Sequence, residues 1–199
     1  MKTVIFGGSF NPFHFGHLKL IKEVQKTVKP DRFILMPTHV APHKVHDDLV
    51  DDADRLEMCR LAAQDADGLE VSDYEINAGG KSYTVLTLEH FRKLYPNDEL
   101  YFAMGSDMLI SFLNWYMPER IMELATLVCN CRDENDRAAI QSARSEIESR
   151  GGRCVITQCE ALVCSSTDVR SRIGAGLPID DLVPESVAKY IEKRGLYRD

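Results

Sequence analysis

The sequence has no long apolar run, no excess of positive charge and no cysteine pair spaced as Cys-x-x-Cys. A membrane-spanning helix needs about 18 or more apolar residues in succession, and no stretch approaches that length. The formal net charge is -7, which argues against nucleic acid or a membrane surface as a partner, because both attract basic proteins. A small polyanion is not excluded, since a few converging donors can outweigh the net charge.

The six cysteines form no recognisable framework. The short apolar run from Met1 to Phe6 is too brief for the core of a secretory signal. We therefore expect a cytoplasmic protein, in which the cysteines remain buried or unused thiols and form no disulfides. The chain has 199 residues, 44% of them hydrophobic. A chain of this length buries roughly 70% of its unfolded surface, and therefore needs neither disulfides nor a metal to hold a core.

Strand and helix patterns alternate along most of the chain. Short β-branched and aromatic runs predict buried strands, and apolar residues at helical spacing predict the helices between them. The predicted strands are 2–6, 32–36, 69–71, 100–104, 126–129 and 153–157, and the predicted helices are 17–28, 54–64, 83–94 and 134–150. Such alternation implies parallel pairing with right-handed crossovers. We therefore predict an α/β fold, a Rossmann-like parallel sheet flanked by helices.

The end of the chain has a different pattern. Residues 167–173 and 184–193 are helical in spacing, with Pro184 suited to a first-turn position and Gly195 to a C-terminal cap. No repeat, low-complexity tract or linker interrupts the sequence. We expect a single domain over 1–199, with a small helical C-terminal part from about residue 165 to 199.

The loop after the first predicted strand is suited to phosphate. In open parallel sheets, ligands bind beyond the carboxyl ends of the strands. Gly7 and Gly8 let the backbone approach a ligand closely, and the helix that follows offers unpaired N–H groups and a positive dipole end. His14 and His17, three residues apart at this helix start, would face the same anion.

Familiar phosphate loops do not fit these residues. No Gly-x-Gly-x-x-Gly follows the strand. Gly80-Lys81-Ser82 matches the end of a Walker A loop, but that motif needs a first glycine at position 75, which holds Glu75. The loop instead resembles the (His/Thr)-x-Gly-His signature of the nucleotidylyltransferase superfamily, here His14-Phe15-Gly16-His17. The partner signature, Ser-Ser-Thr-x-(Ile/Val)-Arg, lies at Ser165-Ser166-Thr167-Asp168-Val169-Arg170.

The resemblance extends over nearly the whole chain, and the bacterial nicotinate-nucleotide adenylyltransferases are the family that it fits. The matching pieces are Gly7-Gly8-Ser9-Phe10-Asn11-Pro12, Pro42-His43-Lys44, Ser82-Tyr83-Thr84, Thr87-Leu88, Gly105-Ser106-Asp107, Trp115 and Gly195-Leu196-Tyr197. Cys164 stands where the family favours isoleucine. Asn130-Cys131-Arg132 replaces a more usual arginine-proline-glycine, so the adenine-side contacts stay open.

The resemblance implies transfer of the adenylyl group of ATP to nicotinate mononucleotide, which gives nicotinate adenine dinucleotide and pyrophosphate on the route to NAD. His17 and His14 would be catalytic. The implied ATP-binding residues are Gly7, Gly8, Ser9, Phe10, His14, His17, Ser165, Ser166, Thr167 and Arg170. The implied acceptor residues are His43, Lys44, Thr84, Asp107, Trp115 and Tyr116. Magnesium would be bound through the ATP phosphates, with no metal ligand from the protein.

Each piece also has a simpler interpretation. His-x-x-His occurs in metal pairs and at capped helix ends, Ser-Ser-Thr is a good N-cap, and a single tryptophan is most often packing. His39, His46 and His90 are interpreted as surface or packing residues. The functional alternatives are the same chemistry on nicotinamide mononucleotide or phosphopantetheine, and a nucleotide-binding regulator without turnover. The choice between a monomer and a homodimer is open.

Overall fold

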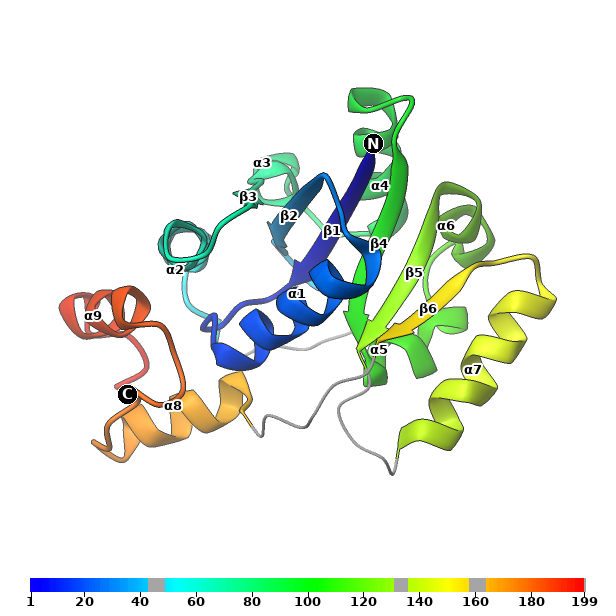
Figure 1. Ribbon diagram of the computed structural model, residues 1–199. Coiled ribbons are helices and arrows are strands. Elements are labelled where there is room, and N and C mark those ends of the chain that lie inside the picture. Colours follow the sequence, from blue (N-terminus) through cyan, green and yellow to red (C-terminus); the bar gives the residue numbers. More distant parts are fainter. Residues whose placement is uncertain (43–48, 131–135, 158–163, 199) are drawn as a thin grey trace.

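A parallel sheet of six strands forms the centre of the protein, seen in a computed structural model that describes residues 1–42, 49–130, 136–157 and 164–198 (Figure 1). The strand order is β3-β2-β1-β4-β5-β6, and all neighbours pair in parallel. This confirms the predicted Rossmann-like α/β fold. The strands are β1 (Lys2–Gly8), β2 (Arg32–Pro37), β3 (Leu69–Val71), β4 (Glu99–Gly105), β5 (Ala125–Asn130) and β6 (Cys154–Thr157).

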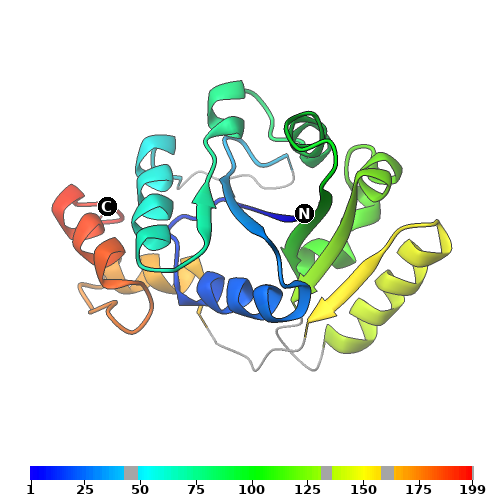
Figure 2. The same cartoon turned by 45° about the horizontal axis from the view of Figure 1, so that its top comes forward.

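Helices cover both faces of the sheet. Side chains alternate along β1, so Val4 and Phe6 belong to one apolar cluster and Ile5 to another. The first cluster takes residues of α1 (Phe15–Val28), α2 (Asp52–Gln64), α8 (Ser166–Gly174) and α9 (Glu185–Arg194). The second takes residues of α4 (Thr84–Leu94), α5 (Ser106–Ile110), α6 (Pro118–Leu124) and α7 (Arg137–Ser149). Figure 2 shows α1 on the opposite side of the sheet from α4 and α6.

The predicted elements are present in the described residues, with ends shifted by a few positions. The helix expected from residue 134 begins at Arg137, and 131–135 lie outside the described residues. Gly195 ends α9 in the left-handed conformation, as expected, with φ 65°. Pro184 precedes α9 as its N-cap residue instead of lying in the first turn.

Short helical segments were not predicted. These are α3 (Tyr74–Ala78) and the 3-10 turn η1 (Phe112–Asn114). Each is shorter than the window over which a helical apolar period can be recognised. Within the part of the chain that the structure describes, no helix is both long and apolar enough to span a bilayer.

The strand order places a crevice between β1 and β4. From β1 the sheet continues through β2 and β3 on one side, and from β4 through β5 and β6 on the other. The connections leaving β1 and β4 therefore diverge at their carboxyl ends, and the sheet offers a ligand site there. The predicted phosphate loop after β1 opens on this crevice.

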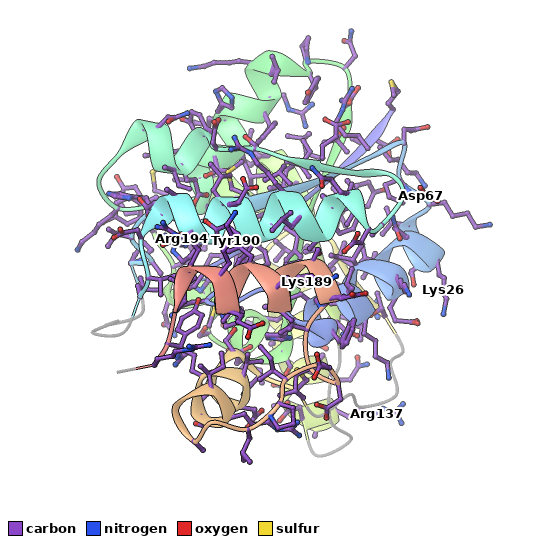
Figure 3. All side chains as sticks on the ribbon, turned by 90° about the vertical axis from the view of Figure 1, so that its left-hand side faces the viewer. Lys26, Asp67, Arg137, Lys189, Tyr190 and Arg194 are labelled. Atoms are coloured by element: carbon purple, nitrogen blue, oxygen red, sulfur yellow. The ribbon has the colours of Figure 1, made fainter. Side chains whose placement is uncertain are left out.

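The C-terminal helix α9 is fastened to α2 by a buried carboxylate. Asp54 on α2 is 4% exposed and accepts hydrogen bonds from the Tyr190 hydroxyl at 2.8 Å and from Arg194 Nε at 3.0 Å. Figure 3 shows Tyr190 and Arg194 on the side of α9 that faces α2. A second hydrogen bond joins the two helices at the exposed end of the interface, where the Ser186 hydroxyl donates to Asp65 at 2.5 Å. Water competes with this bond, so we expect it to contribute less than the Asp54 bonds.

We expect Asp54→Ala to destabilise the protein more than Asp65→Ala. Removal of Asp54 leaves the partly buried Tyr190 hydroxyl without its acceptor, while the exposed Arg194 can bond to water instead. The loss costs about 1–2 kcal/mol and lowers Tm by about 2–8 °C in a protein of this size. Asp65 is exposed, so Asp65→Ala should change Tm by less than about 2 °C. Thermal unfolding of both variants measures the difference, and equal shifts would contradict the role of Asp54.

Candidate active site

A cavity of about 340 Å³ opens beyond the carboxyl ends of β1 and β4. Its wall comes from the loop after β1, the start of α4, the segment between β4 and α6, and the start of α8. His43 and Lys44 lie outside the described residues. Every other residue predicted for the site lines this cavity: Gly7, Gly8, Ser9, Phe10, His14, His17, Thr84, Asp107, Trp115, Tyr116, Ser165, Ser166, Thr167 and Arg170.

The two signature histidines meet at the N-terminus of α1. His14 is the N-cap residue and His17 the third residue of the helix. Their rings stack with centroids 3.6 Å apart, and the His14 backbone N–H donates to His17 Nδ1 at 3.2 Å. Because Nδ1 accepts this bond, a neutral His17 ring carries its proton on Nε2 and can donate from that atom.

Gly16 explains why the histidine signature contains a glycine. A Cβ atom at this position would lie 2.9 Å from the Cys164 carbonyl oxygen and 2.9 Å from His14 Nδ1. Any side chain would therefore push α1 away from the second signature. Cys164 itself is buried, and burial raises the pKa of its thiol. It is thus unsuited to act as a nucleophile.

The second signature caps α8 and is bonded to the loop after β1. The Ser165 hydroxyl accepts from the Asp168 N–H at 3.1 Å, and hydrogen bonds from Ser165 lower the pKa of Asp168. Ser166 Oγ donates to the Pro12 carbonyl at 3.0 Å, and Arg170 Nη1 donates to the Asn11 carbonyl at 2.9 Å. Two helix N-termini, two imidazoles and a guanidinium thus border one cavity in an acidic protein, which favours a polyanionic ligand there.

Aromatic side chains form the other end of the cavity. Trp115 is half-buried and packs against Phe112 and Phe102, with ring centroids 5.5 and 6.2 Å away. Tyr116 is exposed and lies 4.7 Å from the Tyr83 ring. This end offers flat apolar faces, with the Thr84 and Asp107 side chains in the same wall.

Glu75 is a residue of the cavity wall that the sequence did not indicate. It lies on α3, is 7% exposed, and accepts from Thr87 Oγ1 at 2.6 Å. Burial raises the pKa of Glu75, while hydrogen bonds from Thr87 and Ser82 act in the opposite direction. In the sequence Glu75 served only to exclude a Walker loop, because α3 is too short to show which of its faces is buried.

A buried arginine supports the phosphate loop from beneath. Arg55 on α2 is fully buried and donates to the Ser9 carbonyl at 2.7 Å. It pairs with Asp52, which in turn pairs with His39. His39, interpreted from the sequence as a surface or packing residue, therefore belongs to this hydrogen-bonded cluster. Arg55 precedes Met58, Cys59 and Ala62 at the spacing of one helix face. That spacing is the signal in the sequence that could have placed Arg55 on the buried side of α2.

The departure from the family at 130–132 is partly described. Asn130 is buried, and its side-chain oxygen accepts from Thr157 Oγ1 at 3.0 Å. Cys131 and Arg132 lie outside the described residues. Nearby, Ser106 Oγ donates to Asp136 at 2.9 Å, which ties the start of α5 to the start of α7. Asn130 thus has a structural partner on β6.

Known proteins resemble the chain in both sequence and structure. The sequence profile of the cytidylyltransferase-like family matches residues 5–172. A protein of Clostridium tetani is 38% identical over 198 residues, covering 99% of both chains, and one of Desulfitobacterium hafniense is 38% identical over 195 residues, covering 98% of this chain and 94% of its own. Both carry the curated name "Probable nicotinate-nucleotide adenylyltransferase".

The solved structures agree with the fold. The nicotinic acid mononucleotide adenylyltransferase of Plasmodium falciparum, in its complex with NaAD, superposes with a TM-score of 0.76. The alignment covers 99% of this chain and 98% of that one, at 18% identity. This likeness extends to the C-terminal helices as well as the sheet. With the profile match and full-length relatives well above 30% identity, the chain belongs to the cytidylyltransferase-like family and, within it, to the nicotinate-nucleotide adenylyltransferases.

Proposed function

We propose that the protein joins the adenylyl group of ATP to nicotinate mononucleotide, with release of pyrophosphate and formation of nicotinate adenine dinucleotide. The observation that carries this proposal is that one cavity is lined by both anion-binding groups and an aromatic ring. Anion-binding groups at the starts of α1 and α8 line the cavity, and these helices pack in the apolar cluster on one face of the sheet. The half-buried Trp115 lines the same cavity and packs against the apolar cluster on the other face. A dinucleotide product needs both kinds of group in one cavity, because it contains phosphates as well as a pyridine ring.

The acceptor needs no general base. Its phosphate is already an anion at neutral pH, so the barrier comes from repulsion between two polyanions and from charge that builds at the transferred phosphorus. Positioning and electrostatic stabilisation are then the main contributions of the protein. We assign to His17 Nε2 the donation of a hydrogen bond to an α-phosphate oxygen, with His14 assisting at the phosphates.

The leaving pyrophosphate is assigned to the start of α8. Ser166, Thr167 and Arg170 line the cavity there, and the dipole of α8 adds a positive end. Arg170 is half-buried and held by the Asn11 carbonyl, so its guanidinium is oriented before a ligand arrives. Preorganised donors of this kind need little rearrangement as charge develops on the leaving group.

A divalent metal accompanies ATP in enzymes of this family, and we propose Mg²⁺ bound through the phosphates. Among the described residues, no cluster of three or more His, Cys, Asp or Glu side chains could hold a metal ion. The donors around the cavity are suited to phosphate oxygens. This fits a cation that is bound by the nucleotide and enters the site with it. When bound, the metal would neutralise phosphate charge.

The acceptor ring is assigned to the aromatic end. The face of an aromatic ring attracts a cationic pyridinium, and Trp115 is the candidate partner. The backbone N–H of Trp115 already donates to the Phe112 carbonyl at 2.9 Å. We therefore assign recognition of the ring carboxylate to the backbone N–H groups of Tyr116 and Met117 and to the hydroxyl of Thr84. Asp107 belongs to the same subsite, and His43 and Lys44 are proposed to contact the acceptor phosphate.

Pyrophosphate release from ATP in the presence of nicotinate mononucleotide tests the proposal directly. Turnover that depends on both nucleotides supports it. Nucleotide binding without release would instead identify a regulator that kept the fold.

We expect His17→Ala to lower kcat by about a hundredfold or more while ATP affinity changes little, because the lost donor acts mainly in the transition state. His90→Ala is the matched control, since His90 stacks on Tyr74 and is not part of the described cavity wall. Steady-state kinetics and ATP binding of both variants measure the effect. Near-normal turnover of His17→Ala would remove His17 from the mechanism.

Arg170→Lys should lower kcat/KM for ATP by about tenfold or more, because lysine lacks the planar fork that can hold the Asn11 carbonyl and a phosphate together. Arg172→Lys on the same helix is the control, since Arg172 is partly exposed and pairs with Asp181 at 2.6 Å. Unchanged ATP constants for Arg170→Lys would show that the residue is only structural.

Nicotinate mononucleotide should be preferred over nicotinamide mononucleotide. The amide NH2 group would face donors in place of a carboxylate, and each unmatched buried group costs about 1–3 kcal/mol. One mismatch corresponds to roughly tenfold to a hundredfold in kcat/KM. The ratio measured at equal ATP and metal concentrations decides the point. Equal values would contradict the acceptor assignment and leave adenylyl transfer intact.

A further inference from the structure

The segment that follows α9 contacts the loop after β1. Tyr197 follows α9, and its hydroxyl donates to the side-chain oxygen of Asn11 at 2.9 Å, across 186 residues of sequence. Tyr197 is partly buried and packs against the apolar cluster on the α1 side of the sheet. The sequence signature Gly195-Leu196-Tyr197 has no role in the mechanism described above.

The backbone of Tyr197 indicates that this position is held by its surroundings. Its φ is 63°, in the left-handed region, where a tyrosine backbone is strained. Such a conformation persists only when the neighbouring contacts require it. The Asn11 hydrogen bond and the apolar packing both hold this side chain in place.

Asn11 connects four separate parts of the chain. It is 2% exposed and lines the cavity. Its side-chain oxygen accepts from Tyr197 and from the Val50 N–H, the latter at 3.3 Å. Its carbonyl oxygen accepts from Arg170 at 2.9 Å. Rotation of the Asn11 peptide would therefore move the partner that orients the Arg170 guanidinium.

We propose that Tyr197 is a positioning residue for adenylyl transfer, and that its hydroxyl fixes Asn11 so that the Asn11 carbonyl holds Arg170 toward the phosphates. This rests on the function proposed above and extends it to a residue that does not line the described cavity wall. Through this contact, the C-terminal segment helps to orient Arg170 in the part of the site assigned to ATP.

Tyr197→Phe tests this with a matched control. The substitution removes one hydroxyl and keeps the ring that packs against the core. We expect kcat/KM for ATP to fall roughly three- to tenfold, the loss of one hydrogen bond expressed as a rate, while KM for nicotinate mononucleotide stays within about twofold. Tyr190→Phe also removes one C-terminal hydroxyl that donates a bond, to Asp54 at 2.8 Å. It should lower Tm and leave the kinetic constants unchanged.

A mutant cycle shows whether Tyr197 acts through Asn11. In an Asn11→Ala background, Tyr197→Phe should have almost no further effect on kcat/KM for ATP, because the shared contact is already absent. Tyr197→Phe with wild-type kinetics, equal losses for both substrates, or full additivity with Asn11→Ala would each overturn the proposal.

An assay of the wild-type protein distinguishes a failure of the proposed function from a failure of the positioning role of Tyr197. Absence of pyrophosphate release by the wild type would contradict the function alone. The same variants would then be compared by their dissociation constants for ATP. Weaker ATP binding by Tyr197→Phe but not by Tyr190→Phe supports the positioning role, and equal binding by all three proteins overturns it.

Discussion

Two backbone carbonyl groups in the loop after β1, those of Asn11 and Pro12, accept hydrogen bonds from Arg170 and Ser166 at the start of α8. These bonds join segments 154 and 159 residues apart. The close approach at Gly16, where a Cβ would meet the Cys164 carbonyl at 2.9 Å, allows the two helix starts to face one ligand. A polyphosphate can then be bound from two sides by donors that are already in place.

The sheet supplies the rigid base for this contact. Because β1 and β4 are neighbours whose connections diverge, the loop after β1 and the segment after β4 border the same crevice. Arg55 supports the phosphate side through the Ser9 carbonyl, and Glu75 supports the start of α4 through Thr87. Both groups are buried, so their hydrogen bonds keep the polar wall ordered without direct competition from water.

Much of this arrangement could be predicted from the sequence because it depends on local patterns. The run from Lys2 to Phe6 is buried on both faces and therefore lacks alternation, as expected for a central parallel strand. Gly195 ends α9 because a left-handed residue is needed there. The two signatures were recognisable for a similar reason, since His14, Gly16 and His17 act together within one helical turn. The short helix α3 had no such periodicity, and Glu75 was missed with it.

The sequence by itself determined the strands and helices, their parallel order of connection and the residues gathered near the phosphate end. Hydrophobic spacing and helix-end chemistry are local, so they can be recognised without knowing which segments meet. Only the tertiary structure decided the partners of Arg55, Asn11 and Tyr197. The sequence does not show which distant group an arginine, an asparagine or a tyrosine will bond to. Their roles arise from contacts across long sequence separations, which the packing of the helices on the sheet creates.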